Sequence, residues 1–245
     1  MKRKLYFMLI LLNCFVAKSQ ELMVSGGLSL PLNPYSGGDI LDNSDGHATT
    51  GYNFKFDYIF LKQSKLNFSL GAFYFSNDLN TGNLERQYNK AYGKQSVFTL
   101  VSPYTGLGIG GSILYYIGKQ NSKIKGISKI SLGQMFVNSP EYTVVDSNYY
   151  QRVLSNEASS TFWGLGLGIE YSASPQLSLI GFVEYLYSRV DFGNPRSKNA
   201  AGQVITSTSN STNAQAVINL NINIGLSYKF YSYEGKLTQK LKPKK

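Results

Sequence analysis

Hydrophobic and polar side chains alternate one by one along several stretches of the chain. Residues 217–230, with the sequence VINLNINIGLSYKF, carry apolar or aromatic side chains at every second position and mostly polar or small ones between them. Because successive side chains of a β-strand point to opposite faces, this spacing predicts a strand with one apolar and one polar face. The stretch closes on the aromatic Phe230, which is typical of a strand with lipid outside and a polar lumen inside.

Eight stretches share this period of two. The second, fourth and sixth connections between them are short turns, whereas the first, third, fifth and seventh (31–50, 77–102, 138–159 and 193–215) are long loops. Short turns at one end and long loops at the other are typical of transmembrane barrels. The predicted fold class is therefore all-β: a closed, eight-stranded, antiparallel transmembrane β-barrel in an up-and-down meander. The predicted strands are 22–30, 51–61, 66–76, 104–117, 124–137, 160–171, 177–192 and 216–230.

A water-soluble β-sandwich or a lipocalin-like barrel would also show alternation. Such a protein would bury its apolar face, and it would not need many tyrosines near its strand ends. The aromatic residues here fit the girdles that membrane barrels place at both bilayer interfaces, so a membrane barrel is favoured. These residues are Tyr58, Tyr104, Tyr115, Tyr171, Tyr187, Tyr228 and Phe230.

The N-terminus predicts secretion. Lys2, Arg3 and Lys4 precede an apolar run over 5–16, which is followed by Ala17, Lys18 and Ser19. This pattern indicates a signal peptide cleaved after Ser19. Cys14 lies in a poor match to a lipoprotein box, so lipidation is disfavoured, and cleavage would leave a mature chain without cysteine or disulfides. The predicted segments are a signal peptide over 1–19, the barrel over 20–230 and a basic periplasmic tail over 231–245.

The basic charge lies mostly outside the predicted barrel. The formal net charge is +10, but the signal peptide and the lysine-rich tail carry most of it. Basic residues are therefore not laid along one folded face, and a nucleic-acid partner is not expected. The tail could contact anionic lipid headgroups or an acidic partner protein. A solvated chain end is the alternative.

Charged side chains also occur on the predicted inner faces of the strands. Eight strands enclose a lumen that side chains can fill, so a packed polar interior is favoured over a pore. We expect Lys125 and Glu170 to pair on neighbouring strands, and Lys55, Lys129 and Glu184 to pair near mid-height, because an unpaired buried charge is costly. A proton or ion path is the alternative. The predicted interior charge network is Lys55, Asp57, Lys125, Lys129, Glu170 and Glu184, and inner-face glycines of the fourth and sixth strands would leave room for it.

The first long loop contains the candidate metal ligands and the candidate catalytic histidine. Its oxygen ligands Asp39, Asp42, Asn43 and Asp45 suit calcium. The EF-hand spacing fails, however, and a solvated acidic loop is the alternative. No cofactor is expected.

Catalysis has few candidates, and no catalytic residue is predicted. His47 is the single histidine of the chain. Lipid A palmitoyltransferases with eight strands also place a histidine in this loop, and Ser76 and Asp78 could complete a Ser, His, Asp set. The set is built from common residues, and the N-terminal amphipathic helix of that family is missing.

Taken together, these patterns resemble the small eight-stranded outer-membrane barrels of the OmpA/OmpX type. The signal peptide, followed by Gln20 after Ser19, is similar to those of the Bacteroidota porin-family, PorT-like group. The resemblance covers 20–230, and the chain departs from it by continuing past Phe230. It implies an outer-membrane location with both termini periplasmic.

The resemblance also implies a role. It implies contact with outer-membrane lipid and lipopolysaccharide, and a non-enzymatic envelope or interaction role through the long external loops. A protein partner would bind these loops or the basic tail. The alternatives are an accessory subunit of an outer-membrane secretion or assembly machine and a lipid-modifying enzyme.

Overall fold

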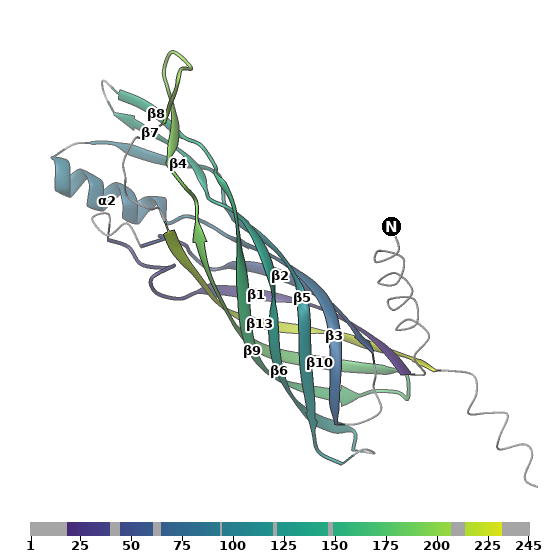
Figure 1. Cartoon of the computed structure of the whole chain (residues 1–245). Helices are drawn as coiled ribbons and strands as arrows, with labels where there is room; N and C mark the ends of the chain where they lie inside the picture. The colour runs from purple at the N-terminus through teal and green to yellow at the C-terminus, as the bar shows by residue number, and fades with distance from the viewer. Residues whose placement is uncertain are drawn as a thin grey trace, which may run out of the picture.

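The computed structural model describes residues 19–39, 45–60, 65–93, 95–119, 122–146, 149–206 and 214–231. Eight long strands close into an antiparallel barrel in the order β1-β13-β10-β9-β6-β5-β3-β2 (Figure 1), which confirms the predicted fold class. The predicted signal peptide and basic tail lie almost wholly outside the described residues. The barrel strands are β1 (Ser19–Pro31), β2 (Gly51–Phe60), β3 (Leu66–Asn77), β5 (Tyr104–Ile117), β6 (Ile124–Asn138), β9 (Glu157–Ser172), β10 (Leu177–Asp191) and β13 (Ala214–Tyr231).

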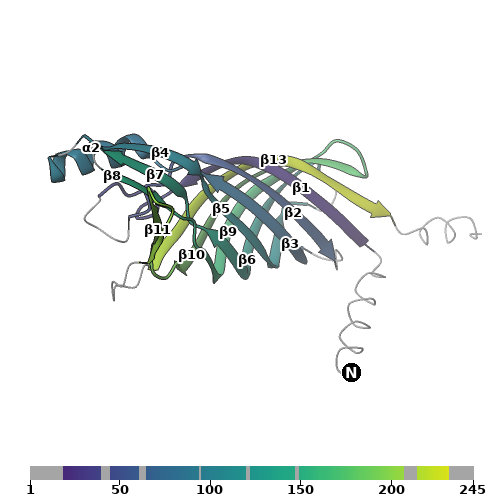
Figure 2. The ribbon, with the colours of Figure 1, turned by 90° about the horizontal axis from the view of Figure 1, so that it is seen from above.

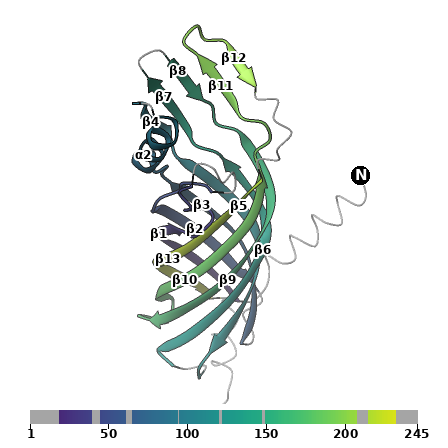
Figure 3. The ribbon, with the colours of Figure 1, turned by 90° about the vertical axis from the view of Figure 1, so that its left-hand side faces the viewer.

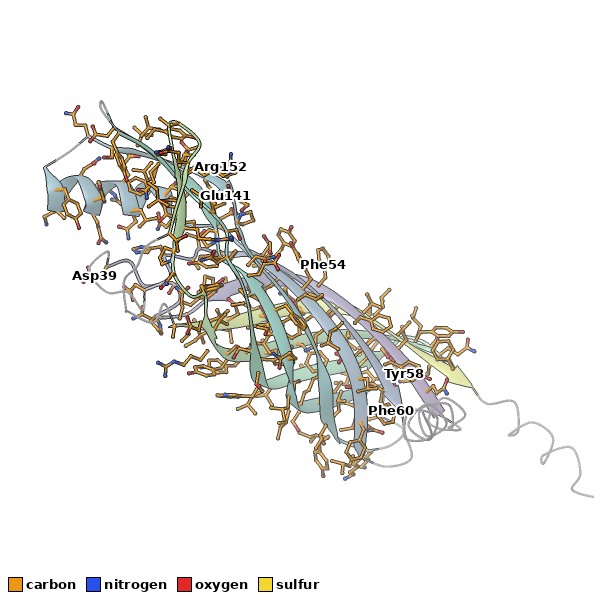
Figure 4. All side chains as sticks on the ribbon, turned by 45° about the horizontal axis from the view of Figure 1, so that its top comes forward. Asp39, Phe54, Tyr58, Phe60, Glu141 and Arg152 are labelled. Atoms are coloured by element: carbon orange, nitrogen blue, oxygen red, sulfur yellow. The ribbon has the colours of Figure 1, made fainter. Side chains whose placement is uncertain are left out.

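Burial alternates along the barrel strands with the predicted phase. On β13, Asn223 is 2% exposed and points inward, whereas its neighbour Ile224 is 76% exposed. On β2, Phe54 and Tyr58 project away from the barrel (Figure 4), while Asp57 between them is buried. A continuous outer surface of exposed apolar side chains is unfavourable in water and fits a hydrocarbon environment. No helix within the described ranges is long and apolar enough to cross a bilayer.

A second sheet rises from one wall of the barrel (Figure 3) and is termed the cap sheet below. Its strand order, β12-β11-β8-β7-β4, repeats the order β13-β10-β9-β6-β5 of the barrel wall beneath it. The sequence pattern predicted simple loops over 77–102, 138–159 and 193–215. Each of these connections instead contributes one or two strands to the cap sheet. The cap strands are β4 (Val97–Ser102), β7 (Glu141–Asp146), β8 (Tyr149–Val153), β11 (Arg196–Asn199) and β12 (Val204–Thr206).

The junction between barrel and cap sheet is marked by proline and by one buried asparagine. Pro103, Pro140 and Pro195 separate β5 from β4, β6 from β7 and β10 from β11, and proline interrupts a strand because it has no N–H to donate. At the fourth junction, between β8 and β9, Asn156 donates from Nδ2 to the backbone oxygens of Phe192 and of residue 194, at 3.1 Å each. The Asn156 side chain thus ties the cap sheet to the end of β10.

One helix, α2 (Thr81–Tyr92), covers the free edge of the cap sheet at β4 (Figure 2). The Asn89 side chain accepts from the Ser96 N–H at 2.7 Å and donates to the Ser96 oxygen at 3.0 Å, as a neighbouring strand would. The Glu85 carboxylate accepts from the Phe98 N–H at 3.3 Å. An uncovered strand edge can pair with a strand of another molecule. These contacts therefore prevent a further strand from pairing with β4.

Candidate functional site

Four charged side chains meet inside the barrel between two apolar layers. Lys55 Nζ lies 2.5 Å from Glu184 Oε2, and Lys129 Nζ lies 2.6 Å from Asp57 Oδ2. Lys129 Nζ is also 3.9 Å from Glu184 Oε1, so both pairs form one cluster. Each of these side chains is at most 10% exposed. Two cations and two anions neutralise one another, which is what a water-poor interior requires.

Gly166 borders this cluster, and a Cβ atom at this position would make ordinary van der Waals contacts. It lies directly between Lys129 and Glu184 in the strand register. A Cβ atom at Gly166 would lie 3.4 Å from Lys129 Cβ and 3.5 Å from Glu184 Cγ. The free space at the cluster is only about 10 Å³, which is barely the volume that one water molecule occupies.

Gly106 and Gly108, which were also expected to leave room for charges, lie against aromatic rings instead. A Cβ atom at Gly106 would lie 2.1 Å from the Phe75 ring, and one at Gly108 would lie 2.2 Å from the Phe73 ring. Phe73 and Phe75 belong to the apolar layer between the charges and the cap sheet. A second apolar layer lies on the other side of the charges and contains Met23, Ile59, Leu114, Tyr116, Ile127, Ile180 and Phe182. Both layers obstruct the lumen.

Glu170 has a different ionic partner from the expected one. Lys125 lies opposite Glu170 in the strand register and is half-buried, but the cation in contact with the Glu170 carboxylate is Lys229 of β13. Ser178, on the strand between them, donates to Glu170 Oε1 at 2.7 Å. The small Ser178 side chain lets Lys229 reach across β10, so the pairing skips the adjacent strand.

Glu21 is an interior carboxylate that sequence reasoning missed. It is fully buried and accepts a hydrogen bond from the Ser227 hydroxyl. The predicted first strand began at 22, whereas β1 begins at Ser19, so Glu21 was left outside the pattern. Its position two residues before Met23, on the same face of the strand, was the available signal.

The predicted metal candidates are only partly described. Asp42 and Asn43 lie outside the described residues, whereas Asp39 and Asp45 lie within them. The Asp45 carboxylate accepts from the Asp39 backbone N–H at 2.8 Å and so closes the loop on itself. In the described part of the chain, no three acidic, histidine or cysteine side chains are grouped to hold a metal ion.

His47 is buried beside this loop. Among the described residues, its Nδ1 atom has no hydrogen-bond partner, and no hydrogen bond joins its side chain to Ser76 or Asp78. Burial lowers the pKa of His47, and the carboxylates of Asp45 and Asp39 partly offset this effect, so the ring is neutral at pH 7. The His47 backbone is structural, because its oxygen accepts from the Asn80 N–H at 2.8 Å where α2 begins.

A small cavity lies under the cap sheet at the mouth of the barrel. Its volume is about 250 Å³, and its walls include His47, Tyr104, Tyr142 and Gln215. The Tyr104 hydroxyl donates to the backbone oxygen of residue 46 at 2.9 Å. The cavity walls also include Leu84 of α2. The cap sheet, α2 and the segment at His47 thus cover the mouth of the barrel above the apolar layer of Phe73 and Phe75.

The outer face of the cap sheet points away from the mouth. Val97, Val145 and Tyr150 form a row across β4, β7 and β8 and are 53%, 43% and 40% exposed. On the inner face of β4, Phe98 packs instead on the helix, and the centroids of the Phe98 and Tyr88 rings lie 5.5 Å apart. The cap sheet therefore leaves apolar side chains on its open face.

Cationic side chains lie beside this apolar row. Arg152 of β8 is directly opposite Lys198 of β11 and forms an ion pair of 2.5 Å with Glu141 at the base of the sheet (Figure 4). Glu141 neutralises Arg152, so Lys198 remains as a positive charge next to the row. The outer face is thus both apolar and basic.

The fold is similar to solved outer-membrane barrels. The major outer membrane protein from Thermus thermophilus aligns with a TM-score of 0.55 at 16% identity, over 86% of this chain and 99% of that one. Neisserial surface protein A gives a TM-score of 0.45 at 14% identity, over 87% and 98% of the two chains. The Escherichia coli outer membrane protease OmpT gives 0.46 at 10%, over 88% and 98%.

Sequence comparison adds nothing to this. No protein-family model matches the chain, and no curated protein matches it significantly. The barrel, its apolar outer surface and the Thermus similarity agree, and the chain has the fold of an outer-membrane β-barrel.

Proposed function

We propose that this protein is a non-enzymatic outer-membrane barrel whose working surface is the outer face of the cap sheet. The observation that carries the proposal is the ordered sheet with an open apolar row, standing on a barrel with an obstructed lumen. Eight strands already leave little room for a pore. A protein built this way acts through what protrudes from the membrane.

The orientation follows the rule for such barrels. Long connections lie on the extracellular side and short turns in the periplasm, so the cap sheet faces outward and both termini of the chain lie in the periplasm. The closed barrel and its similarity to the Thermus protein support a place in the outer membrane of a Gram-negative cell. The signal-peptide resemblance supports a source among the Bacteroidota.

The chemistry of the outer face favours a protein partner. Exposed apolar side chains that stand together mark interaction surfaces, and Val97, Val145 and Tyr150 form such a group. Lys198 adds a positive charge beside them. The partner should therefore present an apolar patch with an acidic rim.

A second candidate is an accessory subunit of a secretion or assembly machine, as a PorT-like resemblance implies. The same apolar row supports this role, because a permanent subunit contact is more apolar than a transient one. A stable complex that survives detergent extraction would favour the accessory subunit, whereas a partner captured only by cross-linking would favour transient recognition. No observation favours a lipid-modifying enzyme, since no described hydrogen bond joins His47 to Ser76 or Asp78.

Photo-cross-linking in intact cells tests the proposed surface. With a photoreactive amino acid at Tyr150, we expect a discrete cross-linked adduct. The matched control is Tyr92, which is 57% exposed but lies on α2. Lys198→Glu should weaken the adduct at Tyr150 by repelling an acidic rim. Equal cross-linking from Tyr150 and Tyr92 would contradict the assignment of this face.

A further inference from the structure

A hollow runs along the outer wall of the barrel where the wall meets the cap sheet. It consists of two adjoining parts of about 460 and 630 Å³, which share Thr105, Asn138 and Glu157. These three residues form one register row across β5, β6 and β9. Because the strands are interrupted just above this row, the wall bends there and leaves the hollow.

The part nearer the membrane is apolar. Tyr74, Leu107 and Phe136 line it and form the next register row below. Leu107 is 46% exposed and Phe136 is 50% exposed, and both belong to the lipid-facing surface of the barrel. A hydrocarbon chain of the outer leaflet matches this part in chemistry and position.

The part nearer the cap sheet contains a positioned guanidinium group. Arg196 donates from Nε to Asn156 Oδ1 at 2.8 Å and from Nη2 to the Ser155 oxygen at 3.1 Å. A guanidinium carries five N–H donors, so these two bonds fix its orientation and leave donors for a ligand. Phosphate oxygens suit such a fork.

Between the apolar part and Arg196 lies the carboxylate of Glu157, which only accepts hydrogen bonds, beside the amide of Asn138 and the hydroxyl of Thr105, which donate as well as accept. The Glu157 side chain is exposed into the hollow, and Asn138 beside it donates to Thr105 Oγ1 at 3.2 Å. A ligand that satisfies Glu157 places a hydrogen-bond donor next to its hydrocarbon chains, and one that also binds Arg196 places its phosphate farther out. Glycerophospholipids have ester oxygens and no donors at that level. Acyl chains attached through amide N–H groups to a phosphorylated amino sugar have the required order.

We propose that this hollow binds a phosphorylated, N-acylated glycolipid of the outer leaflet, the membrane anchor of lipopolysaccharide. An acyl chain lies on Leu107 and Phe136, an amide N–H faces Glu157, and a phosphate binds Arg196. Lys198, two residues beyond Arg196 on the same face of β11, extends the positive charge outward. The site needs a lipid-embedded barrel but no protein partner, so a failure of cross-linking from Tyr150 would leave it intact.

Native mass spectrometry of the purified, folded full chain tests the site. The probes are lipid A with two phosphates and phosphatidylglycerol, each titrated into the same detergent. We expect one lipid A to be retained per barrel, with an affinity at least tenfold above that for phosphatidylglycerol. Arg196→Ala should lower the lipid A affinity about tenfold, as the loss of a charge-assisted hydrogen bond does, and Arg196→Lys should recover part of it.

Matched controls separate the site from general effects. Arg86→Ala removes a cation from α2, and Ile113→Trp adds bulk to the lipid-facing surface of β5 away from the hollow. Both should bind lipid A as the wild type does, whereas Leu107→Trp should fill the hollow and reduce binding. A heat-modifiable gel shift confirms that each variant is folded. Equal retention of both lipids, unchanged binding in Arg196→Ala and Leu107→Trp, or full competition by inorganic phosphate would overturn the proposal.

Discussion

Glu184→Leu is expected to lower the free energy of unfolding by about 3–5 kcal/mol, because it removes one anion from a buried cluster. Lys55 and Lys129 would then share Asp57 alone, and one buried positive charge would stay uncompensated. The measurement is a urea titration of the barrel in lipid vesicles. Trp163, the single tryptophan, is 42% exposed on the lipid-facing surface and reports unfolding by fluorescence.

A double variant distinguishes lost charge balance from lost packing. Lys55→Met with Glu184→Leu removes one charge of each sign and leaves the Lys129–Asp57 pair. Most of the lost stability should return, since an apolar pair of similar volume replaces a buried ion pair at little cost. The control Glu141→Ala breaks the half-exposed pair with Arg152 and should cost less than about 1 kcal/mol. A double variant as unstable as Glu184→Leu would show that the cluster is not held by charge balance.

Ile224→Lys is expected to cost about 2–4 kcal/mol, the penalty for a lysine on the lipid face near the bilayer centre. Ile224 is 76% exposed, and its register neighbours on both sides are Gly26 and Gly181. No adjacent side chain would shield the new charge from lipid. The same urea titration measures the effect.

The matched control for this change lies in the cap sheet. Val204 is 56% exposed, so Val204→Lys introduces the same charge at a similar exposure but outside the bilayer. It should leave the urea midpoint unchanged within about 0.5 kcal/mol. If both lysines had the same effect, the apolar surface around the barrel would not face lipid.

The barrel could be predicted from the sequence because each of its strands separates two different environments. Lipid outside and a packed lumen inside impose a strict period of two over ten or more residues. That period also assigned Lys55, Asp57, Lys129 and Glu184 to the interior. Their mutual distances depend on strand register and barrel closure, which no single strand encodes.

The cap sheet lacked this signal. Its strands contain three to six residues, and both faces of β4 carry apolar side chains, as Val97 and Phe98 show. Phe98 is buried only because α2 packs on it, and α2 comes from the same connection. Likewise, Lys229 replaces Lys125 as the partner of Glu170 because a small serine separates them, a contact between strands distant in sequence.

Ion conductance of the purified protein in planar bilayers tests most directly whether the lumen is obstructed. The proposed function on the outer surface depends on this obstruction. The charge cluster leaves about 10 Å³ of free space and lies between the Phe73 and Ile59 layers. We therefore expect no single-channel steps from wild-type protein that is shown to be folded and inserted. Steady conductance steps would contradict a closed lumen and would indicate a small pore through the barrel.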